Sequence, residues 1–175
     1  MTEYDPISVL MDEHQQFLRE LERFATEMHR LSTLPRIPPL EVRKIVQFGQ
    51  FLARDVDGWH GRKEEEALFP ALGRYLPADA GPIGVMLSEH ELVREQQHSI
   101  ERGALQLESD PEAVEALRHV GAAEQTTRAL LADHIDKEDH VLFPMARSLL
   151  SPQELSEVGV LCQQIDAARG PADRR

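Results

Sequence analysis

An eleven-residue internal repeat restricts how this chain can fold more than any other feature of its sequence. Residues 60–70 read His-Gly-Arg-Lys-Glu-Glu-Glu-Ala-Leu-Phe-Pro, and residues 134–144 read His-Ile-Asp-Lys-Glu-Asp-His-Val-Leu-Phe-Pro. Six of the eleven positions are identical, which is too close a match for unrelated segments. A Glu-His pair at 13–14 recurs at 89–90, at a similar distance before each copy. The chain is therefore predicted to contain two related helical hairpins.

Apolar residues recur throughout the chain with the alternating three-and-four spacing of amphipathic helices. Asp5 ahead of Pro6 has the form of a helix N-cap, and residues 109–112 have the form of a capping box. Residues 151–154, Ser-Pro-Gln-Glu, are predicted to start a short fifth helix. Four longer helices are predicted from stripes that run from Ile7 to Met28, from near Leu40 to Ala71, from Ile83 to Leu107 and from Leu117 to Met145.

The connections between these helices are short, and no stretch of the sequence has the alternation of a β-strand. Proline-rich residues 34–39 and 77–82 are predicted to be loops. Short loops make neighbouring helices antiparallel. The sequence thus predicts an all-α fold, an up-down-up-down four-helix bundle over about residues 5–150, with a short C-terminal fifth helix over about 152–168. Both are expected to belong to a single domain, residues 1–175.

Histidine and glutamate occupy the core-facing stripes of all four long helices. Two helices carry a His and a Glu four residues apart, a spacing that places both side chains on one helix face. The other two helices carry a single His on the apolar stripe. In an up-down bundle all of these side chains can converge at one level, which makes them candidate metal ligands: His14, His60, Glu64, His90, His134 and Glu138.

Such a buried cluster is unfavourable without cations, because an uncompensated buried charge costs several kcal/mol. Imidazole nitrogen combined with carboxylate oxygen suits iron, with zinc, manganese or copper as chemical competitors. Two glutamates can bridge two ions, and two histidines can bind each ion. An octahedral ion would keep room for a bridging oxo or hydroxo group and one exchangeable position. Two iron ions and an open coordination site are therefore expected, and open sites are typical of small-molecule chemistry.

The chain resembles the hemerythrin-like family, whose domains are also called HHE cation-binding domains. The resemblance lies in Asp-Pro-Ile with Glu-His near the N-terminus, Ser-Glu-His at 88–90, and the two repeats at 60–70 and 134–144. It spans roughly residues 5–150. It implies that the six candidate residues correspond to the family's iron ligands, with both glutamates bridging.

One position departs from the oxygen-carrying members of that family, which have a further histidine four residues after the ligand of the third helix. Arg94 stands there in this chain. Asp139 does occupy the place of an aspartate that those members use, but Glu138 matches the symmetric variant better. The resemblance therefore points away from reversible oxygen carriage. It points towards the family's members in iron-cluster repair, iron sensing, and responses to peroxide or nitric oxide.

Four acidic residues flank the candidate ligands. Glu65 and Asp139 follow the two proposed bridging glutamates, and each is expected to form a solvent-facing salt bridge or to replace a ligand. Glu13 and Glu89 precede two of the histidines. Surface charge is favoured for these two over a role in holding a ligand imidazole.

Other polar residues are assigned more ordinary roles. Trp59 and Asp57 could donate or accept a hydrogen bond near a ligand imidazole, but core packing and helix surface are the favoured roles. Cys162 on the fifth helix is expected to be a small packing residue. Surface positions are predicted for the remaining histidines, His29, His98, His119 and His140.

The charge and apolar content exclude several classes of partner. The net charge is −12 and no basic stripe is present, which argues against nucleic acid or an anionic membrane as a partner. No apolar run approaches the ~20 residues of a membrane span. The acidic start of the chain lacks a signal-peptide layout, and a single cysteine excludes an internal disulfide. A cytoplasmic monomer or homodimer is expected.

Three functions remain open from the sequence. The first is a non-haem di-iron protein that binds, senses or reacts with O2, NO or peroxide, with low-level peroxidase-like, catalase-like or NO-handling activity left undecided. The second is an iron-binding module that reports iron availability without turnover. The third is an interaction bundle that needs no metal or is only stabilised by it.

Overall fold

The computed structural model describes residues 4–77 and 80–169, and every regular element within them is helical. The first helix is α1 (Pro6–Leu31). A continuous helical run follows it and comprises α2 (Pro39–Phe51), η1 (Leu52–Gly61), η2 (Glu64–Leu68) and α3 (Phe69–Leu72). The third is α4 (Gly81–Ser109), and the fourth run comprises α5 (Val114–Lys137), η3 (Glu138–Leu142) and α6 (Phe143–Leu149). The chain closes with α7 (Pro152–Ala168).

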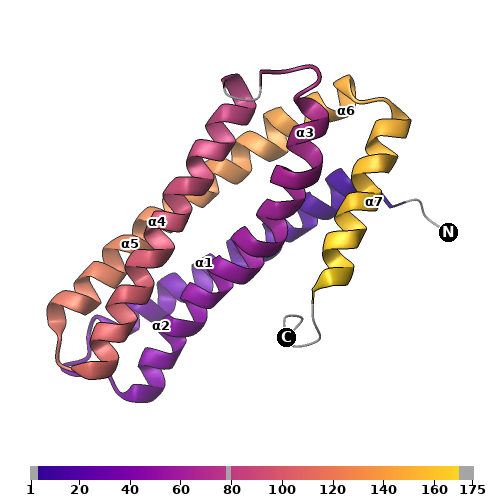
Figure 1. The fold of residues 1–175 in the computed structure, drawn as a ribbon. Helices are drawn as coiled ribbons and strands as arrows, with labels where there is room; N and C mark the ends of the chain where they lie inside the picture. The colour runs from indigo at the N-terminus through magenta and orange to yellow at the C-terminus, as the bar shows by residue number, and fades with distance from the viewer. Residues whose placement is uncertain (1–3, 78–79, 170–175) are drawn as a thin grey trace.

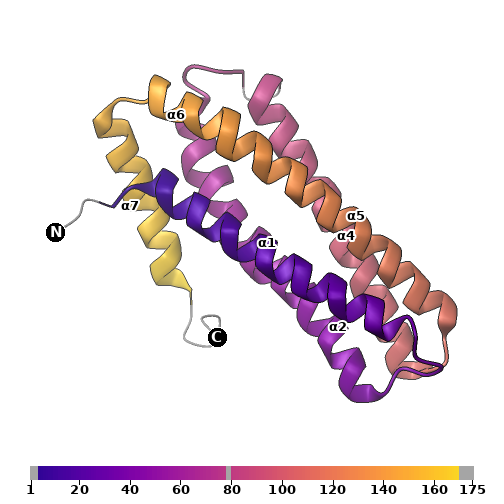
Figure 2. The same ribbon diagram turned by 180° about the vertical axis from the view of Figure 1, so that it is seen from behind.

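These four runs form an antiparallel bundle, and α7 lies outside it (Figures 1 and 2). α4 packs against α2 and α5, and α1 packs against α5 and η1. α7 crosses one end of the bundle, where it contacts α1 and η2. The all-α bundle with a short C-terminal helix is therefore confirmed.

The helices begin where the sequence signals predict at two of the three predicted starts. The Asp5 side chain accepts a hydrogen bond from the Ile7 amide, and Ser151 and Glu154 form a reciprocal capping box. The prediction of a capping box at residues 109–112 is wrong. Ser109 is the last residue of α4, and its hydroxyl donates to the Gln106 carbonyl.

The segment after α4 is a turn instead of a helix start. The Asp110 carboxylate accepts from the Glu112 amide, and the carbonyl of Pro111 accepts from Ile37 in the neighbouring loop. α5 begins only at Val114 and has no side-chain cap. Local side-chain acceptors can stabilise turns as well as caps, so the same residues are compatible with both.

Three segments of π-helix interrupt the α-helices at the level of the candidate ligands. η1 ends just after His60, while Glu64 and Glu138 are the first residues of η2 and η3. Short π-helical stretches are rare and often mark functional sites. Pro70 and Pro144 each stand second in the α-helical segment that follows a π-helical one, and neither can donate a backbone hydrogen bond to the preceding turn.

A polar layer divides the apolar core into two clusters. One cluster, at the end formed by the α1–α2 and α4–α5 loops, includes Phe17, Leu52, Val93 and Leu131. The other, at the end covered by α7, includes Leu10 and a large further set: Ile7, Leu68, Met86, Leu142, Phe143 and Val158. The candidate ligands fill the layer between the two clusters. On α1, for example, His14 stands between Leu10 of one cluster and Phe17 of the other.

Candidate metal centre

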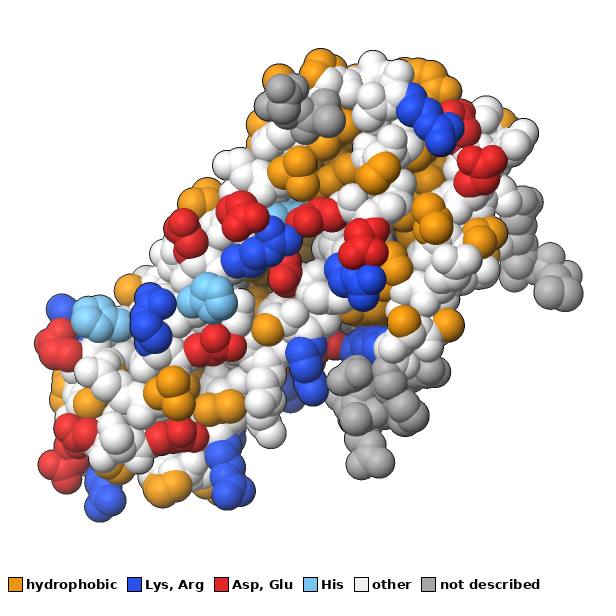
Figure 3. All heavy atoms as spheres, in the orientation of Figure 1, with side chains coloured by type: hydrophobic (Ala, Val, Ile, Leu, Met, Phe, Trp, Pro, Cys, Tyr) orange, Lys and Arg blue, Asp and Glu red, His pale blue; other side chains and the backbone are white. Residues whose placement is uncertain are grey.

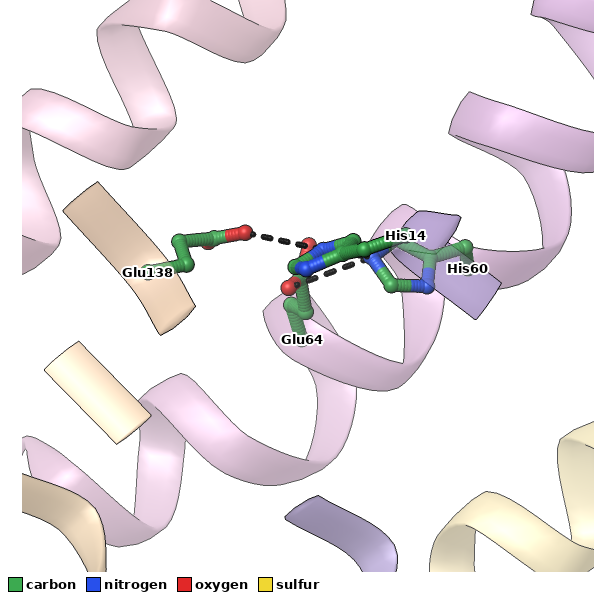
Figure 4. A group of neighbouring side chains, drawn as sticks. All are labelled: His14, His60, Glu64 and Glu138. Atoms are coloured by element: carbon green, nitrogen blue, oxygen red, sulfur yellow. Dashed lines mark hydrogen bonds and ion pairs between the residues drawn. The ribbon is translucent and has the colours of Figure 1, made fainter. Parts of the chain in front are cut away.

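The structure brings all six predicted ligands together in this polar layer. They form two groups that share both glutamates, and within each group one ligand atom from every residue lies within 4.8 Å of the others. Figure 4 shows the first group with its side chains directed towards one another. The two groups are His14, His60, Glu64 and Glu138, and Glu64, His90, His134 and Glu138.

The distances pair the histidines by hairpin, a question that the sequence left open. His14 and His60 come from the first hairpin, and their Nε2 atoms are 3.0 Å apart. Each of the four Nε2 atoms lies 3.2 to 3.4 Å from a glutamate oxygen. Glu64 faces one histidine of each pair, His60 and His90, through different oxygens. This is the arrangement expected of a carboxylate that bridges two cations.

A carboxylate holds the outer Nδ1 atom of each of the four histidines. The Nδ1 atom of His60 is hydrogen-bonded to Glu13 at 2.8 Å, and that of His134 to Glu89 at 3.0 Å. The favoured surface role of Glu13 and Glu89 is therefore wrong. Helix crossing explains the error, since each of these side chains contacts an imidazole on the other helix of its own hairpin.

The second pair of carboxylates connects the two hairpins. Asp139 is 2.7 Å from His14 Nδ1, and Glu65 is 2.7 Å from His90 Nδ1. Glu65 also accepts from Arg94, so a salt bridge is only part of its role. The expectation of mainly solvent-facing salt bridges overlooked the contacts with imidazole. The repeat offers a signal for all four, because Glu13 and Glu89 are equivalent, as are Glu65 and Asp139.

These contacts favour one tautomer of each imidazole. With Nδ1–H donating to a carboxylate, the neutral imidazole has its Nε2 lone pair directed into the layer. All four carboxylate oxygens of Glu64 and Glu138 are buried there without a hydrogen-bond partner. Converging lone pairs and unpartnered carboxylates need positive charge between them. The donor set of nitrogen and oxygen atoms fits iron or a similar transition metal.

The electrostatics of the protein itself indicate the same need. Burial lowers the pKa of His60, but Glu64 and Glu13 outweigh it and raise the pKa to about 9. Burial also lowers the pKa of His90, but contacts with Glu64 and Glu65 outweigh it and raise that pKa to about 10. Positive charge on the imidazoles thus compensates the glutamates when no metal does so. Metal and protons compete for the same atoms.

A lysine contacts the carboxylate of Glu13 in the first hairpin and that of Glu89 in the second, and the two lysines differ in burial. Lys63 donates to Glu13 and is completely buried, whereas the equivalent Lys137 contacts Glu89 and is 35% exposed. Asp166 of α7 causes the difference, because it lies 2.6 Å from the Lys63 amine. Trp59 donates to Asp166 and not to an imidazole. Spacing along the chain does not identify Asp166, since its role depends on where α7 docks.

The remaining assignments agree with the structure. His29, His98, His119 and His140 are all exposed. Cys162 is buried in the apolar cluster under α7, and burial raises the pKa of its thiol to about 12. Among the described residues, no helix is long and apolar enough to cross a membrane.

Comparison with known proteins agrees with the geometry. The family described as Hemerythrin HHE cation binding domain matches residues 5–146. Iron-sulfur cluster repair proteins YtfE of Escherichia coli (strain K12 / DH10B) and Shigella boydii serotype 18 are each 31% identical over 137 residues. The alignment covers 77% of this chain but only 60% of those relatives, so it spans part of their length. On this evidence, the chain belongs to the hemerythrin HHE cation-binding domain family.

Proposed function

We propose that this chain is a non-haem di-iron protein that binds or reacts with O2, NO or peroxide. His14 and His60 would hold one iron, His90 and His134 the other, and Glu64 and Glu138 would bridge them as the remaining ligands. The observation that carries the proposal is the set of four buried, unpartnered glutamate oxygens facing four imidazole nitrogens. Zinc or manganese could occupy the same ligands as substitutes.

The site has the features of a reactive centre rather than a closed structural one. An iron pair bound by these residues would supply redox chemistry and could keep a coordination position open for a ligand. The protein's own part is to orient the imidazoles through Nδ1 and to exclude bulk water. A cavity of about 20 Å³ adjoins the four histidine rings, which is room for about one water-sized molecule.

The name of the curated relatives suggests the setting. They are called iron-sulfur cluster repair proteins, and we propose that this chain acts in iron handling or in the response to NO or peroxide, in the cytoplasm. Reversible oxygen transport is disfavoured, since Arg94 replaces the additional histidine and donates to Asp57 and Glu65. Within this proposal the two hairpins form one domain together with α7, which buries Lys63.

Azide binding tests this function against an iron-binding module that has no exchangeable position. We expect iron-loaded protein to show charge-transfer absorbance that shifts when azide is added, because azide would occupy the open position. Apo protein, prepared with a chelator, provides the blank. If the spectrum of iron-loaded protein does not change when azide or NO is added, the proposed reactivity is contradicted. Stabilisation by iron without any such response would favour the module.

A further inference from the structure

The two halves of the polar layer are equivalent at the ligands but differ at the positions beside them. Aligning the repeats pairs Asp57 with Leu131 and Gly61 with Ile135. Aligning the single histidines pairs Arg94 with Leu18. One face of the layer therefore carries polar or small side chains where the opposite face carries leucine and isoleucine.

The cavity beside the histidine rings lies between these two faces. Both Asp57 and Gly61 line it on one side, and Leu131 and Ile135 line it on the other. Leu131 and Ile135 are buried in the apolar cluster, and Leu18 packs against that cluster. A β-carbon added at Gly61 would come within 3.9 Å of His90 Cε1. The missing side chain thus leaves space directly beside a candidate ligand.

Arg94 lies beside the polar side of this cavity, where it contacts the lining residue Asp57. Its Nε donates to Asp57 at 2.7 Å, and the two terminal guanidinium nitrogens donate to Glu65 at 2.6 Å and to Glu91 at 2.7 Å. Glu65 in turn contacts His90 Nδ1. Three of these charged side chains are roughly 30% exposed, at 27%, 31% and 28% for Arg94, Asp57 and Glu65. Figure 3 shows charged side chains of both signs gathered over the middle of this face, where α4 meets η1.

We propose that small ligands reach the metal centre from this face only, between Arg94, Asp57 and Gly61, and that Arg94 eases the entry of anionic ligands by offsetting the carboxylates around it. The equivalent path on the opposite face is filled by Leu18, Leu131 and Ile135. The guanidinium is paired with three carboxylates, so it reduces the negative charge at the mouth without reversing it. Removing it would leave those carboxylates to repel anions, which slows anions more than neutral ligands. This inference rests on the proposed di-iron function.

Stopped-flow measurements with azide, an anion, and NO, a neutral ligand, test the route in iron-loaded protein. In Gly61→Ile, which gives the polar wall the side chain of its counterpart, we expect both association rates to fall about tenfold or more. In Arg94→Ala, which opens the mouth and removes the guanidinium charge, we expect NO to bind faster and the azide-to-NO rate ratio to fall about threefold or more.

The internal repeat provides the matched control. Leu18→Ala shortens the residue equivalent to Arg94 on the opposite face, and both rates should stay within about twofold of the unsubstituted protein, because that face is not the route. Equal effects of Leu18→Ala and Arg94→Ala would overturn the inference, as would unchanged rates in a folded Gly61→Ile protein. If Gly61→Ile does not fold, the comparison of Arg94 with Leu18 decides. Metal analysis comes first, since a protein without iron refutes the proposed function instead.

Discussion

Replacing Glu64 with alanine is expected to abolish binding of both metal ions, not just one. Glu64 belongs to both groups of converging ligand atoms and faces His60 and His90 through separate oxygens. Loss of residues that only support a ligand typically weakens metal affinity by about 10–100-fold, so loss of a shared ligand should exceed roughly a hundredfold. The variant should also lose metal-linked stability, which is about 4 kcal/mol at a metal concentration a thousand times the dissociation constant.

Glu66→Ala is the matched control for Glu64→Ala. Glu66 stands two residues further along η2, is exposed, and pairs only with Arg62 among the contacts described. Metal content after purification and the melting temperature with and without chelator are the measurements. Retention of one full equivalent of iron in Glu64→Ala would contradict a bridging role. An equal loss of metal in Glu66→Ala would show a general effect of negative charge.

Replacing Lys63 with methionine is expected to give the largest loss of stability among single changes outside the ligands. The Lys63 amine is completely buried between Glu13 and Asp166, 2.6 Å from each, and lies 3.9 Å from the centre of the Trp59 ring. Methionine keeps the volume but removes the ammonium that both carboxylates contact, and Glu13 is buried. Breaking a buried ion pair in this way costs about 3–5 kcal/mol.

The repeat again supplies the control, since Lys137→Met is the same change at the equivalent position. Lys137 contacts Glu89 and Asp133, but it is 35% exposed, and no helix within residues 4–77 and 80–169 covers it as α7 covers Lys63. Solvent screening limits its contribution to about 1 kcal/mol or less. Urea denaturation of both metal-free variants compares their free energies of unfolding. Similar losses in the two variants would mean that α7 and Asp166 do not increase the contribution of Lys63 to stability.

The repeat and the helical periodicity predicted the bundle and the six converging residues. Those features depend on spacing along the chain: His60 and Glu64 are four residues apart, so any helix puts them on one face. Short loops then bring the four helices to a common level. The cap at Asp5 and the box at Ser151 were also predictable, because a cap involves only residues close in sequence.

Features that depend on how helices cross were not predictable in the same way. Glu13 reaches His60 and Asp166 reaches Lys63 only because of the angles at which their helices pack. The π-helical segments that carry His60, Glu64 and Glu138 have no simple signature in apolar spacing. The wrong cap at Ser109 has a different cause, since its neighbour Asp110 stabilises a turn as readily as a helix start.

Anaerobic titration of metal-free protein with ferrous iron tests the paired metal site most directly. Two ions should bind per chain, because two histidine pairs share two glutamates around separate positions. Ferrous binding can be followed by the protons that the imidazoles release and by loss of free iron from solution. An end point at two equivalents is the predicted result. An end point at one, or no saturable binding at all, would contradict a di-iron centre.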